Sequence, residues 1–268
     1  MKKRLFALGL ALVLVLGLSA CAGKTDSKTI KVGATPAPHA EILEVTKDLL
    51  AEKGYTLEIV EFDDYIMPNT AVEDGELDAN YFQHITYMNT FNTDNGTHLV
   101  SAGAIHYEPF GLYAGKTASL DALADGAQIS IPNDATNGGR ALLLLQEQGL
   151  ITLADDCGLE PTVQDIVDNP KNLEIVELEA RLLPTTLQDV DMAVINGNYA
   201  IDAGLKIADA LAVESNDGAA AEAYANVVAV KEGNEDSEAI QALVEALKSE
   251  EVRAFIEETY QGAVMPLF

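Results

Sequence analysis

An alternation of strand and helix patterns that runs twice through the chain constrains its fold more than any other feature. The first round begins at "TIKVGA" (29–34), continues with an amphipathic helical pattern (38–54), and returns to alternating apolar residues in "TLEIVEF" (56–62). Strand patterns follow at 77–83 and 98–115, with helical patterns between them. This order is typical of a mostly parallel sheet with helices on its faces.

A second round begins after Lys116. We expect strands at "AQISIP", "LEIVELE" and "DMAVING", and helices at "GGRALLLLQEQG", "TVQDIVD", "PTTLQDV" and "NYAIDAGL". A late strand, "ANVVAVKEG", and two helices are more than this half needs, so we expect them to cross back. The sequence thus predicts an α/β chain of two lobes, with 29–113 plus 226–268 as lobe 1 and 114–225 as lobe 2.

The N-terminal residues predict export and a lipid anchor. A positive start, "KKR", precedes the apolar run "LFALGLALVLVLGL", which ends in "LSAC". The run is short and closes with small residues, so 1–20 is expected to be a signal peptide and not a membrane span. A small residue before Cys21 resembles the lipobox of bacterial lipoproteins. That resemblance implies cleavage before Cys21, lipidation of its sulfur and a polar tether at 21–28.

Composition excludes some partners and makes one arginine informative. The formal net charge is −27, which disfavours nucleic acid and anionic lipid as partners. After signal removal the arginines are Arg140, Arg181 and Arg253 only. If Cys21 carries lipid, Cys157 is left alone, so no internal disulfide is possible. We expect Cys157 to be a small, buried or half-buried residue.

Polar and aromatic residues gather where the predicted strands end. His39 follows the first strand, "YFQH" and "IHYEPFG" follow two others, and "PNDATNGGR" and "INGNYA" follow strands of the second half. Strand ends of two α/β lobes meet at the cleft between them, where ligands bind. We expect Arg140 and a helix N-terminus to hold a carboxylate there, and Asn196 to hold an ammonium group. Tyr81, Phe82 and His84 are expected to flank an apolar side chain; a thioether would contact such rings favourably.

These segments resemble the methionine-binding lipoproteins of ABC uptake systems. The resemblance is carried by the lipobox and by several long stretches: "TIKVGATPAPHAEIL", "GELDANYFQH", "EPFGLYAGK", "IPNDATNGGRALLLLQ", "NPKNLEIVELEA", "DMAVINGNYA" and "NVVAVKEG". It implies a two-lobe periplasmic-binding-protein fold of type II. It also implies an extracytoplasmic receptor, anchored by lipid to the bacterial cell membrane, that delivers methionine to an ABC permease and its ATPase. Neither a cofactor nor catalysis is implied.

The resemblance also assigns residues. Arg140 matches the carboxylate-binding arginine, and Asn196 matches the asparagine that holds the amino acid. Phe82 and His84 match positions that line the side-chain pocket. The remaining implied ligand contacts are Tyr81, His106, Asn137 and Asn198. Ala135 departs from the family pattern, because proline is common at this position.

Two other functions stay open at this level. His39, His84 and His106 at strand ends could instead bind zinc, since a closed zinc site needs three or four ligands. An enzyme on the same fold would need an acid–base pair beside the cleft, for which His84 or Glu108 could serve. The motifs leave open whether the ligand is L-methionine, D-methionine or a methionine-containing dipeptide.

Overall fold

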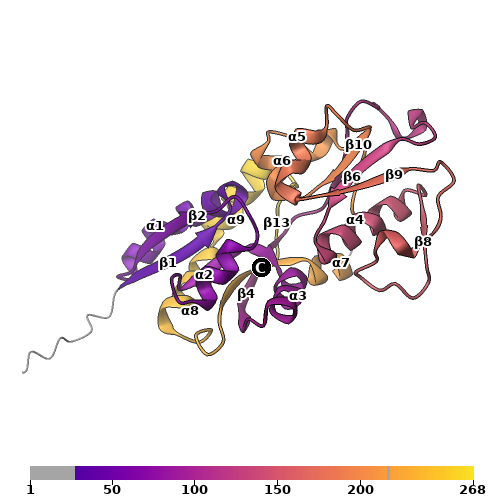
Figure 1. Cartoon of the computed structure of the whole chain (residues 1–268). Coiled ribbons are helices and arrows are strands. Elements are labelled where there is room, and N and C mark those ends of the chain that lie inside the picture. The colour runs from indigo at the N-terminus through magenta and orange to yellow at the C-terminus, as the bar shows by residue number, and fades with distance from the viewer. Residues whose placement is uncertain (1–27, 216–217) are drawn as a thin grey trace, which may run out of the picture.

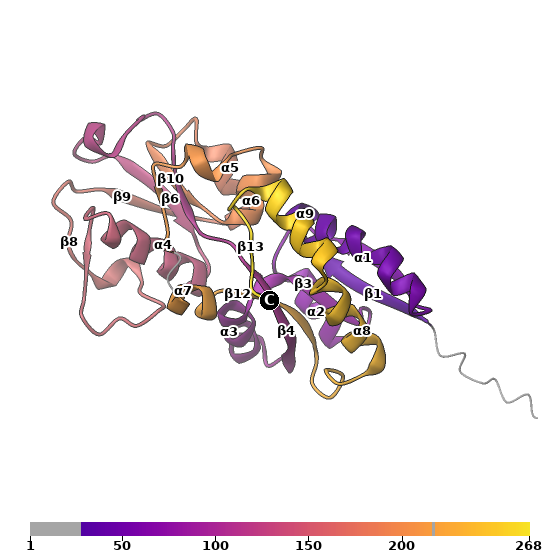
Figure 2. The same ribbon diagram turned by 180° about the vertical axis from the view of Figure 1, so that it is seen from behind.

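The computed structural model describes residues 28–215 and 218–268, which form two α/β lobes (Figure 1). The lobes lie on either side of a central region where the chain passes from one to the other (Figures 1 and 2). The predicted signal peptide, the predicted lipidation site Cys21 and the tether before Lys28 lie outside the described residues. Within the described residues, no helix is both long and apolar enough to cross a membrane.

The first lobe is built on a six-stranded sheet in the order β13-β4-β12-β3-β1-β2. Its strands are β1 (Thr29–Ala34), β2 (Thr56–Glu61), β3 (Ala79–His84), β4 (Leu99–Tyr107), β12 (Ala225–Lys231) and β13 (Met265–Pro266). Its helices are η1 (Pro36–Ala40), α1 (Glu41–Glu52), α2 (Met67–Glu73), α3 (Ile85–Asn95), α8 (Glu238–Leu247) and α9 (Glu250–Tyr260).

The second lobe is built on a five-stranded sheet in the order β11-β5-β10-β6-β9. Its strands are β5 (Gly111–Ala114), β6 (Gln128–Pro132), β9 (Glu174–Leu178), β10 (Met192–Ile195) and β11 (Ala212–Val213), beside a small hairpin of β7 (Thr152–Leu153) and β8 (Ile166–Asp168). Its helices and turns are η2 (Leu120–Ala122), α4 (Ala135–Glu147), η3 (Val163–Asp165), η4 (Ala180–Leu182), α5 (Leu183–Thr186), α6 (Gly197–Asp202) and η5 (Ile207–Asp209). Helix α7 (Gly218–Ala223) leads back to β12.

Each sheet has a parallel part that is extended by antiparallel strands. Strands β2, β1 and β3 are parallel, as are β10, β6 and β9. The strands next to the passages between the lobes pair antiparallel: β4 with β12, and β5 with β10 and β11. The chain therefore passes between lobes at 108–110 and again between β11 and β12. The predicted boundary at 113 falls inside β5, which hydrogen-bonds in the second sheet, so lobe 2 begins earlier than expected.

The late strand β12 confirms the expected return to the first lobe. It lies between β3 and β4 and is buried on both faces of the sheet. Val228 and Val230 pack in one core with α1 and α8, whereas Val227 and Ala229 pack in another with α2 and α3. Alternate side chains of a strand point to opposite faces, so a continuous apolar run suits this central position.

One predicted helix is wrong. "TVQDIVD" forms a single 3₁₀ turn (η3) followed by β8, which pairs with β7. The side chain of Asp165 accepts hydrogen bonds from the backbone N–H and hydroxyl of Thr162, which closes the turn after three residues. The β-branched residues Ile166 and Val167 then continue as a strand, the conformation their branching favours.

Candidate functional site

A cavity lies between the lobes and is lined by both. Six of the eight residues assigned from the sequence line it: Phe82, His84, Asn137, Arg140, Asn196 and Asn198. Tyr81 and His106 do not line this cavity; they lie buried behind its wall, in contact with Glu108 or with each other. The other lining residues are Tyr65, Gln83, Tyr87, Glu108, Phe110, Gly197 and Asn226.

Arg140 is a buried cation held on several sides. Its guanidinium lies 4.1 Å from the ring centres of both Phe110 and Tyr224. Its Nε and Nη2 donate to the two carboxylate oxygens of Glu214 at 2.8 and 2.5 Å, and Nη2 also donates to the carbonyl of Glu108 at 2.7 Å. Burial alone would lower the pKa of Arg140, but the charge and hydrogen bonds of Glu214, together with Tyr107 and Tyr224, outweigh it and raise that pKa. The residue therefore stays charged, with Nη1 left for another acceptor.

Arg140 and the glycine pair lie inside helix α4, and not at the helix entrance where Arg140 was expected. Helix α4 begins at Ala135, so Arg140 lies in its second turn and not at its N-terminus. The N-terminus is capped from within the chain, because Asp134 accepts the backbone N–H of Asn137 at 2.9 Å. A Cβ on Gly139 would approach Glu160 to 2.7 Å, and one on Gly138 would approach the Pro132 carbonyl oxygen to 2.9 Å. The glycines thus allow close backbone packing at the start of α4.

Three polar residues join the two sides of the cavity. His84 Nδ1 accepts the backbone N–H of Tyr87 at 3.0 Å, so its proton lies on Nε2, which donates to Asn137 Oδ1 at 3.1 Å. The side-chain N–H of Asn196 donates to the same oxygen at 3.0 Å. Burial lowers the pKa of His84 to about 3, so the ring is neutral. The remaining oxygen of Asn196, Oδ1, is buried and has no hydrogen-bond partner in the structure.

An aromatic wall forms the apolar side of the cavity. Tyr65, Phe82 and Tyr87 lie with ring centres 5.6 to 6.3 Å apart. Edge and tilted arrangements at this spacing are favourable for aromatic rings. The wall, which comes from lobe 1, therefore suits an apolar or thioether side chain, whereas lobe 2 supplies Arg140 and the free Asn196 oxygen.

The lobes are in contact around this cavity. The Tyr65 hydroxyl donates to Asn198 Oδ1 at 2.6 Å, and the Tyr199 hydroxyl donates to the carbonyl of Asp63 at 2.9 Å. Tyr65 and Tyr199 also stack, with ring centres 5.0 Å apart. Each of these contacts joins a residue of lobe 1 to one of lobe 2. The structure is therefore a closed arrangement of the two lobes.

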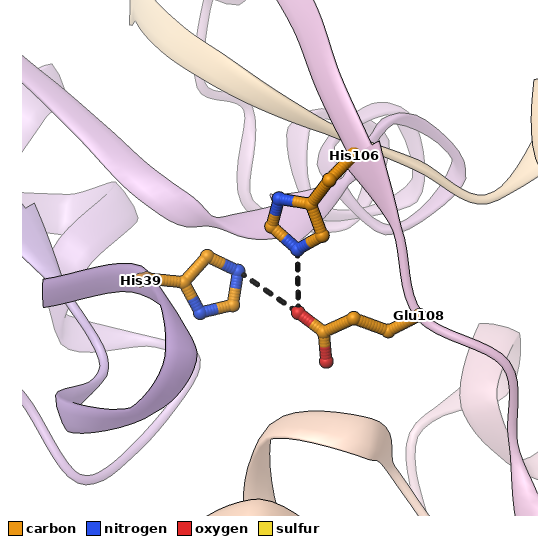
Figure 3. A group of neighbouring side chains, drawn as sticks. All are labelled: His39, His106 and Glu108. Atoms are coloured by element: carbon orange, nitrogen blue, oxygen red, sulfur yellow. Dashed lines mark hydrogen bonds and ion pairs between the residues drawn. The ribbon is translucent and has the colours of Figure 1, made fainter. Parts of the chain in front are cut away.

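Behind the cavity wall, His39 and His106 converge on Glu108 (Figure 3). His106 Nε2 lies 2.7 Å from Glu108 Oε1, and His39 Nε2 lies 3.3 Å from the same oxygen. His39 also contacts Asn226 Oδ1 through Nε2 and the Thr35 hydroxyl through Nδ1, and His106 Nδ1 meets the Tyr81 hydroxyl. Burial lowers the pKa of His39 to about 4 and that of His106 to about 3.

This cluster differs from the histidine set considered for zinc. His84 is not part of it, because its ring is bonded to Tyr87 and Asn137, and Glu108 stands in its place. Both Nε2 atoms already have oxygen partners, and both Nδ1 atoms lie beside hydroxyl groups. The alternative of His39, His84 and His106 as joint zinc ligands therefore does not fit the geometry.

Sequence reasoning did not assign several residues that build the site. Glu214 and Tyr224 hold Arg140 from more than 70 positions away in the chain. Phe110 and Asn226 line the cavity, as do Tyr65 and Tyr87, and so does Glu108, which the sequence suggested only for an acid–base pair. Glu108 and Phe110 fall within "EPFG" at a strand end, so that stretch held a usable signal. Nothing local to "AVESN" connects Glu214 to Arg140.

Comparisons with known proteins point in one direction. The family model described as NlpA lipoprotein matches residues 30–268. The chain is 43% identical to the methionine-binding lipoprotein MetQ of Bacillus subtilis, covering 99% of both chains. It is 42% identical to the D-methionine-binding lipoprotein MetQ of Salmonella typhimurium, covering 98% of both. The structure of a nutrient binding protein from Burkholderia cenocepacia bound to methionine superposes with a TM-score of 0.85 at 42% identity, covering 89% of this chain and 100% of that one.

Proposed function

The chain belongs to the NlpA lipoprotein family, and from that premise we propose that it is a methionine receptor of an ABC importer. Members of this family are substrate-binding proteins and not enzymes. The receptor would capture methionine outside the cytoplasmic membrane and deliver it to a permease driven by an ATPase. Relatives that bind methionine support this assignment.

The observation that carries the proposal is the polarity of the cavity. One wall offers Arg140 Nη1 for a carboxylate and the unpartnered Asn196 Oδ1 for an ammonium group. The other wall offers three aromatic rings for the side chain. A zwitterion with an unbranched apolar tail complements both walls. Phe82 and His84 stay assigned to the side-chain end, as the sequence implied.

Tyr81 and His106 are proposed to act behind the wall and not as direct ligand contacts. Both lie outside the cavity lining and are fully buried. Asn137 is proposed to hold Asn196 and His84 in place, since both donate to its side-chain oxygen. Asn198 is proposed to act in closure through its bond to Tyr65.

Transport follows from differential affinity. A ligand that touches both lobes favours the closed state, because the contacts from one lobe are lost when the cleft opens. The permease would then distinguish the closed, loaded receptor from the open one. We also propose that lipid on Cys21 keeps the receptor at the membrane; the family's naming as lipoproteins supports this.

The ligand's identity is tested by mass spectrometry of the protein purified without denaturation, since a retained ligand would reveal its mass. Calorimetry with L-methionine, D-methionine and a glycyl-methionine dipeptide then ranks the candidates, with L-methionine expected to bind most tightly. Binding stabilises the folded state by mass action, so L-methionine should also raise the melting temperature. A rise with zinc and none with any methionine compound would overturn the proposal.

Asn196→Ala tests the ammonium end of the site. The variant removes an unpartnered acceptor of a cavity-lining residue, so affinity for methionine should fall by at least tenfold, the cost of about one hydrogen bond to a charged group. Unchanged affinity would place the ammonium group elsewhere.

A further inference from the structure

Two carboxylates stand near the cavity, and the described part of the cavity lining offers a single cation, Arg140. Glu214 takes that cation in a two-point ion pair through Nε and Nη2. Glu108 offers Arg140 only its backbone carbonyl. The carboxylate of Glu108, 6% exposed, therefore lacks a cation of its own in direct contact.

The partners that Glu108 does have are neutral. The amide oxygen of Asn226 can only accept a hydrogen bond, so His39 carries its proton on Nε2. Its Nδ1 then accepts a hydrogen bond from the Thr35 hydroxyl. The carboxylate of Glu108 can likewise only accept, so His106 donates to it through Nε2. Nδ1 of His106 then accepts a hydrogen bond from the Tyr81 hydroxyl. Burial keeps both rings uncharged at neutral pH, since it lowers the pKa of each by two units or more below its usual 6.5.

The histidines occupy one oxygen of Glu108, a residue that itself lines the cavity. Oε1 faces the Nε2 atoms of both histidine rings, whereas Oε2 points away from them (Figure 3). Oε2 lies 2.7 Å from where a Gly197 Cβ would be, and Gly197 lines the cavity beside Asn196. A side chain at this position would clash with Glu108, because its Cβ would also lie 2.8 Å from the Glu108 Cβ. Burial raises the pKa of Glu108, and the nearby charge of Arg140 and the backbone N–H of Asn198 oppose that rise without cancelling it.

A buried carboxylate without a cation is costly, and the cost is removed when a cation arrives. We infer that Glu108, held by His39 and His106, is a specificity-determining residue that binds the charged amino group of the ligand together with Asn196. The two histidines are positioning residues: they orient the carboxylate without touching the ligand. The site would thus select for a free amino group and reject carboxylic acids that lack one.

This inference rests on the proposed function. Binding of two ligands distinguishes a failure of the inference from a failure of the proposed function. The probes are L-methionine and 4-(methylthio)butanoic acid, which is methionine without its amino group. Wild-type protein should bind methionine at least about 100-fold more tightly than the acid, because the acid leaves Glu108 and Asn196 unpaired. If neither compound binds, the proposed function fails. If both bind equally well, this inference fails and the proposed function stands.

Glu108→Gln tests the residue itself. Removing the charge should weaken methionine binding by about 30-fold or more while changing the affinity for the amino-free acid by less than threefold. An equal loss for both ligands would show a merely structural role and overturn the inference, as would an unchanged preference. Glu245→Gln is the matched control, since Glu245 is an exposed lobe-1 carboxylate paired with Lys53. It should leave both affinities unchanged.

His106→Phe and His106→Gln test the positioning role. Phenylalanine removes the donor to Oε1, so the preference for methionine over the acid should shrink by about fivefold or more. Glutamine can restore an N–H donor and should recover part of that preference. The wild-type comparison of the two ligands keeps the inference testable even if a variant at this buried position does not fold.

Discussion

For Arg140, the sequence predicted the location of the residue but not its contacts. Its scarcity and its place after a strand end predicted a buried cation in the cleft, and the structure places it there. Its position in the second turn of α4 and its ion pair with Glu214 were not predictable. The ion pair joins segments 74 residues apart, and no local pattern encodes such a contact.

Arg140→Ala should abolish most of the affinity for methionine. The variant removes the proposed carboxylate partner and also leaves the half-buried carboxylate of Glu214 without its cation, so a loss of about 3 kcal/mol or more in binding is expected. Calorimetry at fixed ionic strength measures it, with circular dichroism to confirm folding. The exposed Arg181 supplies the control, because Arg181→Ala should bind as the wild type does. Full affinity in Arg140→Ala would contradict the assignment.

His84 should make the fold sensitive to acid. Burial, aided by the charge of Arg140, lowers its pKa to about 3, against 6.5 in an unfolded chain. Between these values the unfolded chain binds a proton that the folded chain does not, so stability falls as the pH drops below 6.5. At pH 5 the loss from this residue is about 2 kcal/mol. Urea unfolding at pH 7 and pH 5 should therefore show a smaller acid loss for His84→Gln than for the wild type. An equal loss of stability between pH 7 and pH 5 in the two proteins would contradict the lowered pKa of His84.

At the scale of elements, the sequence predicted long, strongly patterned segments well and short ones poorly. The amphipathic helix α1 and the apolar strand β12 fell where their periodicity indicated. "TVQDIVD" did not, because one capped turn and a pairing with distant β7 outweighed its helical spacing. The start of α4 was placed too late for a related reason: the cap by Asp134, and not the glycine pair, sets it.

That cap makes Ala135 a site for stabilisation. Ala135 is the first residue of α4, is exposed, and follows Asp134, whose extended backbone (φ −82°, ψ 149°) tolerates a following proline. Ala135→Pro should raise the free energy of unfolding by about 0.5 to 1 kcal/mol by restricting the unfolded chain. Chemical denaturation measures the gain. Ala141→Pro, in the interior of the same helix, is the contrasting control and should cost about 3 kcal/mol or more.

At the scale of the whole molecule, two lobes meeting over a shared cavity were predictable from the repeated strand–helix order. The contacts that hold them closed were not, since Tyr65, Asp63 and Thr90 of lobe 1 meet Asn198, Tyr199 and Glu160 of lobe 2 only after both have folded.

Tyr65→Phe tests the contribution of one such contact to closure. It keeps the aromatic wall but removes the hydroxyl that donates to Asn198 at 2.6 Å. A loss of about 0.5 to 1.5 kcal/mol in ligand affinity is expected, the usual net worth of a hydrogen bond. Scattering should also show a larger open fraction at subsaturating ligand. Tyr55→Phe, which packs in the core of lobe 1, is the control and should leave the affinity unchanged. An effect of equal size in both variants would argue against a closure role.

The return of β12 also sets the order in which the molecule can be completed. All five strands of the second sheet come from residues 111–213, so that lobe needs nothing later in the chain to pair them. Strands β3 and β4 of the first sheet, in contrast, both pair with β12, which lies much later in the chain, at 225–231. During synthesis from the N-terminus, the second lobe can therefore pair all its strands before β12 has been made. At that point the first sheet still lacks its central strand. The cavity, whose lining includes Asn226 of that strand, is finished only when β12 is in place.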